Sequence, residues 1–397
     1  MLTGRRYLLA LTPEQEQFAG LIGDACRTVW NVGLEQRRAY RRRGASVGYV
    51  EQARQMAEAK RDFPWLAEAP SHTLQQTLRD LERACGTHGT FRVRWRSKSK
   101  TAPSFRFPDP KHIAVERLCR RWGRVRLPKL GWVRFRWTRP LGGELRNATV
   151  LKDGGRWYVS FCVQDGMAEA CPNGGPAVGV DRGVKAAVAT SDGHLRDRAF
   201  ITPGEAARLK RLQHKLARQR KGSNRRAATR ARIAALNARV RARRTDFLAW
   251  TANRLTRDHE LVAVEDLKVR SMTASARGTL EAPGVHVRQK AGLNRAILAK
   301  GWGALLTALE HKARYNGSRI VRVPAAYTSQ RCSACGLVDA KSRESQAVFA
   351  CTSCTYTGNA DVNAAKNILA AGLAVTGRGD LAAGRSAKRQ PPDGQAA

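Results

Sequence analysis

Acidic residues are scarce in this chain. It holds 32 aspartates and glutamates against 72 lysines and arginines, which gives a formal net charge of +40 over 397 residues. A surface this positive repels itself unless a polyanion neutralises it. The expected partner is therefore nucleic acid, with RNA as a good candidate, and a membrane surface is the weaker alternative.

Long apolar runs are also missing. The sequence has no stretch of 18 or more apolar residues, so it predicts no membrane-spanning helix. The opening residues, MLTGRRYLLALTPEQ, lack the long apolar core and the small-residue cleavage site of a signal peptide. We therefore expect no membrane partner and a cytoplasmic location in a prokaryotic cell, with association to the nucleoid when the protein is bound to DNA.

The nine cysteines fall into two groups. Cys332 with Cys335 and Cys351 with Cys354 form two CxxC pairs that are 15 residues apart. This spacing is typical of a ribbon-type zinc site, and four thiolates around one Zn²⁺ leave no open position, so the metal would be structural. Accidental pairs or disulfides are the alternative. The remaining cysteines are scattered, as buried free thiols usually are, which favours a reducing compartment: Cys26, Cys85, Cys119, Cys162 and Cys171.

The first 90 residues are predicted to be mostly helical. Residues 1–10 read as a short strand, and the run Thr12-Pro-Glu-Gln is typical of a helix start. Further helices are expected at 49–60 and 71–86. The second of these has an apolar stripe, while its other side chains suit base edges and phosphates or, with equal weight, a solvated face: Gln75, Gln76, Arg79 and Arg83.

From Phe91 the hydrophobic pattern changes to period two. The segments FRVRWRSK, RVRLPKLGWVRFRW and LRNATVLKDGGRWYVSFCV alternate apolar with basic or polar residues, and residues 152–155 form a hairpin turn. We expect a small barrel or a curled sheet. Its outward side chains could hold a phosphate backbone and stack on bases: Arg92, Arg94, Trp132, Arg134, Arg136 and Trp137.

The second half of the chain alternates strands and helices. The segment AVGVDRGVKAAVATSDG, residues 177–193, is expected to form an apolar strand that carries Asp181, followed by a turn and a second strand. Further strands are expected at 261–265 and 318–323, a basic antiparallel helical hairpin at 203–220 and 223–257, and a helix at 293–315. The segment 271–290 has no periodicity, so it is a lid or an ordinary surface loop. The tail after about residue 376 is poor in apolar residues and is predicted to be disordered.

Three acids stand at the ends of these elements. Asp181 lies on a strand, Glu265 ends a distant strand, and Asp361 opens a helix after the second cysteine pair. Alone, each could be a turn or helix cap. Their order is that of an RNase H-like nuclease core, in which carboxylates hold two Mg²⁺ ions that act on both the attacking and the leaving oxygen of a phosphodiester. Asp181 would bridge both ions, and Glu265 and Asp361 would each hold one.

Several motifs resemble one known family. TSQRCSACG, SRESQAVFACTSC and NADVNAAKNIL resemble the C-terminal signature of TnpB, the transposon-associated RNA-guided nuclease, and of the compact type V CRISPR effectors related to it. VGVDRGVKAAVATSDG and LVAVEDLKVRSM resemble the first two RuvC motifs of that family. FPWLAEAPSHTLQQTLRDLERAC and RVRLPKLGWVRFR resemble its N-terminal half. The resemblance covers nearly all of the chain before residue 370.

This resemblance implies a multidomain α/β protein. It places a wedge-like β-barrel at 1–10 and 88–172, with a helical recognition insert at 11–87. A RuvC nuclease core follows at 173–326, including the basic helical hairpin at 203–257. The remaining parts are a zinc-ribbon nuclease subdomain, the C-terminal RuvC helix and a disordered tail, at 327–357, 358–375 and 376–397.

The resemblance also implies an activity. The expected function is that of an Mg²⁺-dependent RNA-guided DNA endonuclease, with a guide RNA, double- and single-stranded target DNA, and a short adjacent motif as partners. Arg343 matches a family arginine that would neutralise the scissile phosphate, although a solvated arginine is the alternative. Thr355 stands where such zinc knuckles usually have glycine, and the short tail leaves a transposon or a CRISPR context open.

Two other functions compete with this one. A cleavage-deficient relative would bind DNA under RNA guidance and act as a repressor, but its expected mark is the loss of a carboxylate, and Asp181, Glu265 and Asp361 are all present. A zinc-ribbon RNA-binding protein without catalysis would explain the charge and the cysteines but not the placement of the acids. A monomer and a homodimer are both compatible with the sequence.

Overall fold

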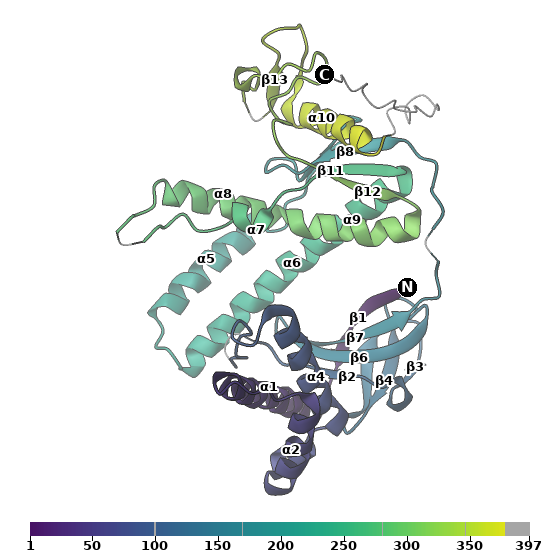
Figure 1. The fold of residues 1–397 in the computed structure, drawn as a ribbon, viewed down its shortest axis with the longest axis vertical. Helices are drawn as coiled ribbons and strands as arrows, with labels where there is room; N and C mark the ends of the chain where they lie inside the picture. The colour runs from purple at the N-terminus through teal and green to yellow at the C-terminus, as the bar shows by residue number, and fades with distance from the viewer. Residues whose placement is uncertain (99–100, 169, 280, 346, 378–397) are drawn as a thin grey trace, which may run out of the picture. The chain divides into compact units, whose positions relative to one another are not determined.

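The computed structural model describes residues 1–98, 101–168, 170–279, 281–345 and 347–377 (Figure 1). The chain divides into two compact units, of which the first contains Met1–Ala168 and Leu212–Ala238 and the second contains the rest. The predicted tail at 376–397 lies outside the described residues from residue 378 on. Among the helices that the structure describes, none has the length and apolar character needed to cross a bilayer.

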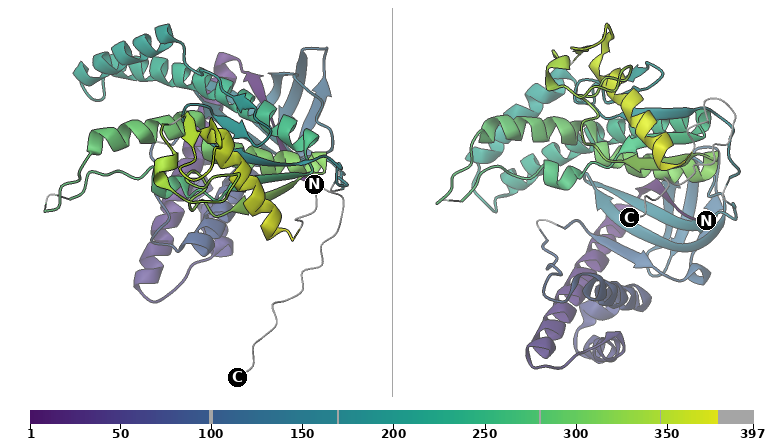
Figure 2. Two further views of the ribbon diagram at one scale, coloured as in Figure 1. Left: turned by 90° about the horizontal axis from the view of Figure 1, so that it is seen from above. Right: turned by 45° about the horizontal axis from the view of Figure 1, so that its top comes forward.

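The first unit is built on a curved antiparallel sheet of seven strands (Figures 1 and 2). Its strand order is β2-β6-β7-β1-β5-β4-β3. The alternating segments 122–136 and 144–164 form strands because one face of each is buried and the other is polar. The strands are β1 Leu2–Ala10, β2 Ser104–Phe107, β3 Ala114–Arg117, β4 Trp122–Leu127, β5 Gly131–Arg136, β6 Glu144–Asp153 and β7 Arg156–Gln164.

Four helices accompany this sheet. The first begins with a capping box, in which the backbone N–H of Gln15 donates to Thr12 Oγ1 and the backbone N–H of Thr12 donates to Gln15 Oε1, both at 3.2 Å. Helix side chains such as Ile22 and Leu74 share one core with strand residues such as Phe105. The helices are α1 Pro13–Arg42, α2 Tyr49–Asp62, α3 Pro64–Glu68 and α4 Ser71–His88, and a 3₁₀ turn lies at Pro110–His112.

The segment 91–98 is not a strand, contrary to the prediction from its alternating pattern. Side chains of α1 form hydrogen bonds with the backbone groups of this segment instead. Trp30 Nε1 donates to the carbonyl of Arg94, and the Asn31 amide both donates to the carbonyl of Arg96 and accepts from its N–H. Because these groups are already satisfied, the segment needs no neighbouring strand.

Two smaller expectations were also wrong. Gln76 does not lie on the outer face of α4: it is buried and its amide donates to Asp80 Oδ1 at 2.9 Å. Among the unpaired cysteines, Cys119 and Cys171 are exposed, whereas Cys26 is buried. The helical pattern misplaced Gln76 because a wide buried face extends one position beyond the leucine stripe.

The second unit has a five-stranded sheet of order β10-β9-β8-β11-β12. The strands β8 Ala177–Asp181, β11 Leu261–Glu265 and β12 Arg319–Val323 run parallel, and the antiparallel β9 Val188–Thr190 and β10 Leu195–Arg196 complete one edge. Val262 and Val264 pack with residues of α6 and α9, whereas Leu261 and Ala263 pack on the opposite face with Ile368 of α10. The central strands β8 and β11 are apolar up to their final acids because both faces of the sheet are covered there (Figure 1).

The helix α10, Ala360–Val375, lies directly on β8. A Cβ added at Gly179 would come within 2.0 Å of the carbonyl oxygen of Ala365, so only glycine permits this close approach. Asn359 caps α10, accepting from the backbone N–H groups of Asp361 and Val362 at 3.0 and 3.1 Å. The side chain of Asp361 is therefore not used as the helix cap.

The remaining helices agree with the sequence except at two places: the segment 271–290, expected to be a lid or a loop, is helical at 271–272 and at 287–290, and the helix expected at 293–315 is broken. The basic hairpin consists of α5 Pro203–Arg218 and α6 Asn224–Asp258, and its part Leu212–Ala238 belongs to the first unit. The single helix expected at 293–315 is two helices, α8 Val287–Lys300 and α9 Trp302–Asn316, because Gly301 adopts a left-handed conformation with φ of 76°. The short helix α7 Val269–Met272, a 3₁₀ turn at Ala340–Ser342, and the hairpin β13 Val348–Ala350 with β14 Thr357–Asn359 complete the unit.

Candidate active site and zinc centre

The three predicted acids meet at one end of the second sheet. Asp181 and Glu265 are the last residues of β8 and β11, which are neighbouring parallel strands with Val180 opposite Val264. The carboxyl ends of parallel strands are where ligands bind in open α/β sheets. Asp361, in the first turn of α10, reaches the same place because α10 packs on β8. All three line one cavity of about 280 Å³.

The acids perturb one another electrostatically. Burial, followed by the nearby carboxylates of Glu265 and Asp361, raises the pKa of Asp181 from 3.8 to about 7. Burial also raises the pKa of Asp361, and the guanidinium of Arg343 opposes this rise. Carboxylates crowded in a partly buried cavity are unstable as anions without a counterion, so this cavity favours a multivalent cation.

Arg343 is the fourth predicted residue at this cavity. It follows the 3₁₀ turn at Ala340–Ser342, and its Nη2 lies 3.3 Å from Asp361 Oδ1. The side chain of Asp361 is only 13% exposed and that of Arg343 28% exposed. The arginine is therefore paired inside the cavity, which argues against the solvated alternative.

Other acids near these motifs are engaged elsewhere. Asp192 accepts a hydrogen bond from Thr190 in the turn after β9. Asp339 caps the 3₁₀ turn through the N–H of Lys341 and accepts from Thr352 at 2.7 Å. These acids have local structural roles, so the cavity carboxylates are the better candidates for metal ligands.

Two residues at the site were missed by the sequence analysis. Thr328 Oγ1 donates to Glu265 Oε1 at 2.5 Å, and both residues are buried. Arg182, also buried, donates through its two terminal nitrogens to the backbone oxygens of Glu265 and Trp302. The sequence does show that Arg182 stands beside a strand acid and that Thr328 comes shortly before the first cysteine pair. Neither position, however, predicts that the side chain contacts Glu265.

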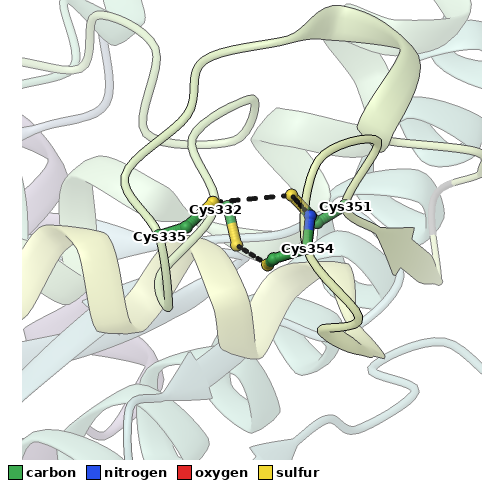
Figure 3. A group of neighbouring side chains, drawn as sticks. All are labelled: Cys332, Cys335, Cys351 and Cys354. Atoms are coloured by element: carbon green, nitrogen blue, oxygen red, sulfur yellow. Dashed lines mark hydrogen bonds between the residues drawn. The ribbon is translucent and has the colours of Figure 1, made fainter.

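The four predicted zinc ligands converge (Figure 3). Their sulfur atoms all lie within 4.8 Å of one another, with Cys332 Sγ at 3.7 Å from Cys354 Sγ and Cys335 Sγ at 3.6 Å from Cys351 Sγ. Sulfurs in a tetrahedron around Zn²⁺ stand about 3.8 Å apart, given Zn–S bonds of about 2.3 Å. The cluster therefore has the dimensions of a four-thiolate zinc site.

The backbone of the second knuckle also favours a thiolate. The N–H groups of Ser353 and Cys354 donate to Cys351 Sγ at 3.5 and 3.4 Å, and these bonds lower the pKa of Cys351 to about 6. Thr355, in the position where glycine is usual, does not prevent the four sulfurs from meeting.

The predicted nucleic-acid contacts lie in the first unit. Arg79 and Arg83 of α4 are exposed, and Gln75 is half-buried. Arg134 and Arg136 of β5 are exposed, and their guanidinium groups lie 4.9 and 4.3 Å from the ring of Trp122. Cation–π pairs of this kind hold a basic and aromatic face in a fixed arrangement.

Comparison with known proteins identifies the family. A model described as "Cas12f1-like, TNB domain" matches residues 302–368, and one described as "Probable transposase" matches residues 160–276. The chain is 36% identical over 386 residues to InsQ of Escherichia coli K12, which is named for a proposed RNA-guided DNA endonuclease activity; the match covers 96% of this chain and 94% of InsQ. The chain belongs to the TnpB family of RNA-guided DNA endonucleases.

Two further similarities locate shared parts. The Cas12f1 CRISPR-associated endodeoxyribonuclease of Sulfoacidibacillus thermotolerans is 48% identical over 58 residues, which are 15% of this chain and 14% of that protein. The cryo-EM structure of a Cas12f1–sgRNA–target DNA complex matches with a TM-score of 0.55 at 12% identity, covering 93% of this chain and 98% of that one. A Cas12f-like multidomain α/β fold is therefore shared.

One family description does not match the local geometry. A model described as "Helix-turn-helix domain" matches residues 1–45. In this TnpB-family chain these residues form β1 and one continuous helix, α1. β1 lies within the sheet of the first unit, and α1 packs in the same core as that sheet.

Proposed function

We propose that this protein is an RNA-guided DNA endonuclease that cleaves target DNA next to a short adjacent motif. The observation that carries the proposal is the convergence of Asp181, Glu265 and Asp361 on one cavity from segments far apart in the chain. Membership of the TnpB family supports it. The net charge of +40 supports a nucleic-acid partner.

The donor set suits magnesium. Mg²⁺ prefers carboxylate oxygens, and Asp181, Glu265 and Asp361 would be the residues that hold two such ions. When bound, these ions would activate a water molecule and stabilise the leaving oxygen of the scissile phosphodiester. Arg343 is placed beside Asp361 to neutralise charge on the phosphate.

The other parts would hold the nucleic acids. In this proposal the curved sheet is the wedge-like barrel, the helices α1–α4 form the recognition insert, and the second unit contains the RuvC core. Guide pairing would supply sequence specificity, while the protein holds the heteroduplex by its shape. The basic residues of α4 and β5 would contact phosphates, and one structural Zn²⁺ would hold the ribbon at Cys332–Cys354.

The test uses the protein purified with its co-expressed RNA. A plasmid that carries a matching target beside a randomised flank should be cut in Mg²⁺, and sequencing the cut ends identifies the adjacent motif. Asp181→Asn should abolish cutting while binding to the target, measured by gel shift, is retained. Asp246→Asn, which removes an exposed carboxylate of α6, should cut normally.

Each other result selects a different conclusion. Cutting that persists in Asp181→Asn would contradict the proposal, because the nuclease would then lie elsewhere. Guided binding by the wild-type protein without cutting would favour the cleavage-deficient repressor.

A further inference from the structure

The hydroxyl of Thr328 lies against a proposed metal ligand. Its Oγ1 lies 2.5 Å from Glu265 Oε1 and 3.2 Å from the carbonyl oxygen of Ala325, so the one hydroxyl proton is donated to the nearer carboxylate. Thr328 and Glu265 are each only 8% exposed. A buried hydrogen bond from a hydroxyl to a carboxylate is short and strong, so it restricts rotation of the carboxylate plane. The bond engages Oε1, while Glu265 itself lines the cavity that the other two acids share.

The turn that carries Thr328 is held by two buried asparagines of α10. Asn367 Nδ2 donates to the carbonyl of Thr328 at 2.9 Å and to that of Arg331 at 2.6 Å. Asn363 Nδ2 donates to the same Arg331 carbonyl at 2.8 Å, and its Oδ1 accepts from the N–H of Ser333 at 2.9 Å. Asn363 and Asn367 are about one turn of α10 apart, so together they hydrogen-bond to consecutive residues of the segment that carries Thr328.

The same turn leads directly into the zinc cluster. Cys332 follows Arg331, to which both asparagines are hydrogen-bonded, and it is buried. The backbone N–H of Cys332 donates to the carbonyl of Leu337 at 2.8 Å. Tyr327, beside Thr328, has a φ of 60°, a conformation that a non-glycine residue keeps only where its surroundings fix it. The turn is therefore fixed from one side by α10 and from the other by the cysteine cluster.

We infer that Thr328 is a positioning residue, which orients Glu265 for divalent-cation binding and ties that orientation to α10 and to the zinc ribbon. This inference rests on the proposed function, in which Glu265 is a metal ligand. The helix α10 also carries Asp361. One helix thus supplies one carboxylate directly and sets the direction of a second through Asn367 and Thr328.

The test replaces the hydroxyl with a methyl group in Thr328→Val, which keeps the volume nearly unchanged. Mn²⁺ bound by the complex of protein and guide RNA is measured by electron paramagnetic resonance, and the signal that Asp181→Asn removes defines the site. Loss of a residue that orients a metal ligand typically weakens metal binding by about 10–100-fold. We expect that loss in Thr328→Val, together with a matching increase in the Mg²⁺ concentration for half-maximal cutting.

Matched variants separate orientation from packing. Thr328→Ser keeps the hydroxyl and should bind Mn²⁺ like the wild type, and Asn367→Ala should weaken binding in the same direction as Thr328→Val. Thr307→Val removes an exposed hydroxyl that bonds only to its own helix at Gly303, and it should change nothing. If Thr328→Val fails to fold, as judged by its thermal transition, Thr328→Ala provides the comparison with Thr328→Ser.

The outcomes distinguish the two proposals. Wild-type Mn²⁺ affinity in both Thr328→Val and Thr328→Ala, or equal weakening in Thr328→Ser, would overturn the positioning role while Asp181→Asn still loses the ion. If Asp181→Asn binds Mn²⁺ and cuts like the wild type, the metal site itself is absent, and the proposed function fails with the inference.

Discussion

Asp181→Asn should make the protein more stable at alkaline pH while it abolishes cutting. Burial and the neighbouring carboxylates raise the pKa of Asp181 from 3.8 to about 7. Below pH 3.8 the carboxyl group of Asp181 is protonated in both the folded and the unfolded chain, so it does not reduce the free energy of unfolding. Between pH 3.8 and about 7 the folded chain retains a proton that the unfolded chain has released, so stability falls as the pH rises.

The size of this effect follows from the shift. A change from 3.8 to about 7 corresponds to at most ~4 kcal/mol of destabilisation when Asp181 is fully ionised, above pH 7. Solvent reaches the half-buried group, and protons are shared among the coupled carboxylates, so about 1–3 kcal/mol is the expected net value. For a unit of this size, 1 kcal/mol shifts the melting temperature by about 2–4 °C.

The assay is calorimetry of the RNA-free protein at pH 4.5 and pH 8, without Mg²⁺ and without a chelator, so that zinc is retained. Asp181→Asn should melt above the wild type at pH 8, and the difference should shrink at pH 4.5. Saturating Mg²⁺ should raise the melting temperature of the wild type more than that of the variant, because only the wild type binds the ion fully.

The exposed acid Asp246 provides the control. Its side chain is 78% exposed and its ion pair with Arg198 spans 3.5 Å, so Asp246→Asn should change stability by less than about 0.5 kcal/mol. The reasoning is refuted if Asp181→Asn melts no higher than the wild type at pH 8. It is also refuted if the difference between their melting temperatures is the same at pH 4.5 and at pH 8.

Three further predictions concern the elements around this cavity. Gly179→Ala should destabilise the protein by about 1–3 kcal/mol and slow cutting, because the new Cβ would lie 2.0 Å from a backbone oxygen of α10. Gly4→Ala is the control, since its Cβ would lie 3.8 Å from the nearest neighbour. Equal melting temperatures of the two variants would contradict the close packing at Gly179. Metal analysis should find one zinc per chain in the wild type and none in Cys335→Ser, whereas the exposed Cys171→Ser should keep the zinc. Arg343→Ala should lower the cutting rate at saturating Mg²⁺ by roughly 10²–10³-fold with target binding intact. Arg343→Lys should recover part of the activity, whereas an unchanged rate in Arg343→Ala would exclude a catalytic role.

Local patterns predicted the elements that position the site. The apolar runs before Asp181 and Glu265 could be assigned to buried strands because a strand covered on both faces has no polar positions until it ends. The run that begins at Thr12 likewise marked the start of α1, since both hydrogen bonds of its capping box are made within four residues. Such signals are local, so the sequence contains them completely.

Contacts between distant segments could not be predicted in the same way. The segment 91–98 has the alternation of a strand, but its backbone partners are Trp30 and Asn31 of α1, which no local pattern indicates. The role of Thr328 is similar, because its partner Glu265 lies 63 residues away. Burial of such polar side chains depends on how helices and strands pack, which periodicity alone does not determine.

The order of the three carboxylates along the chain has a consequence for synthesis. Asp181 and Asp361 are 180 residues apart, and at about 5–20 residues per second the ribosome adds the second roughly 10–40 s after the first. The strands that carry Asp181 and Glu265 can pair before α10 exists. A growing polypeptide therefore lacks the third carboxylate of the proposed metal site until α10 has been synthesised.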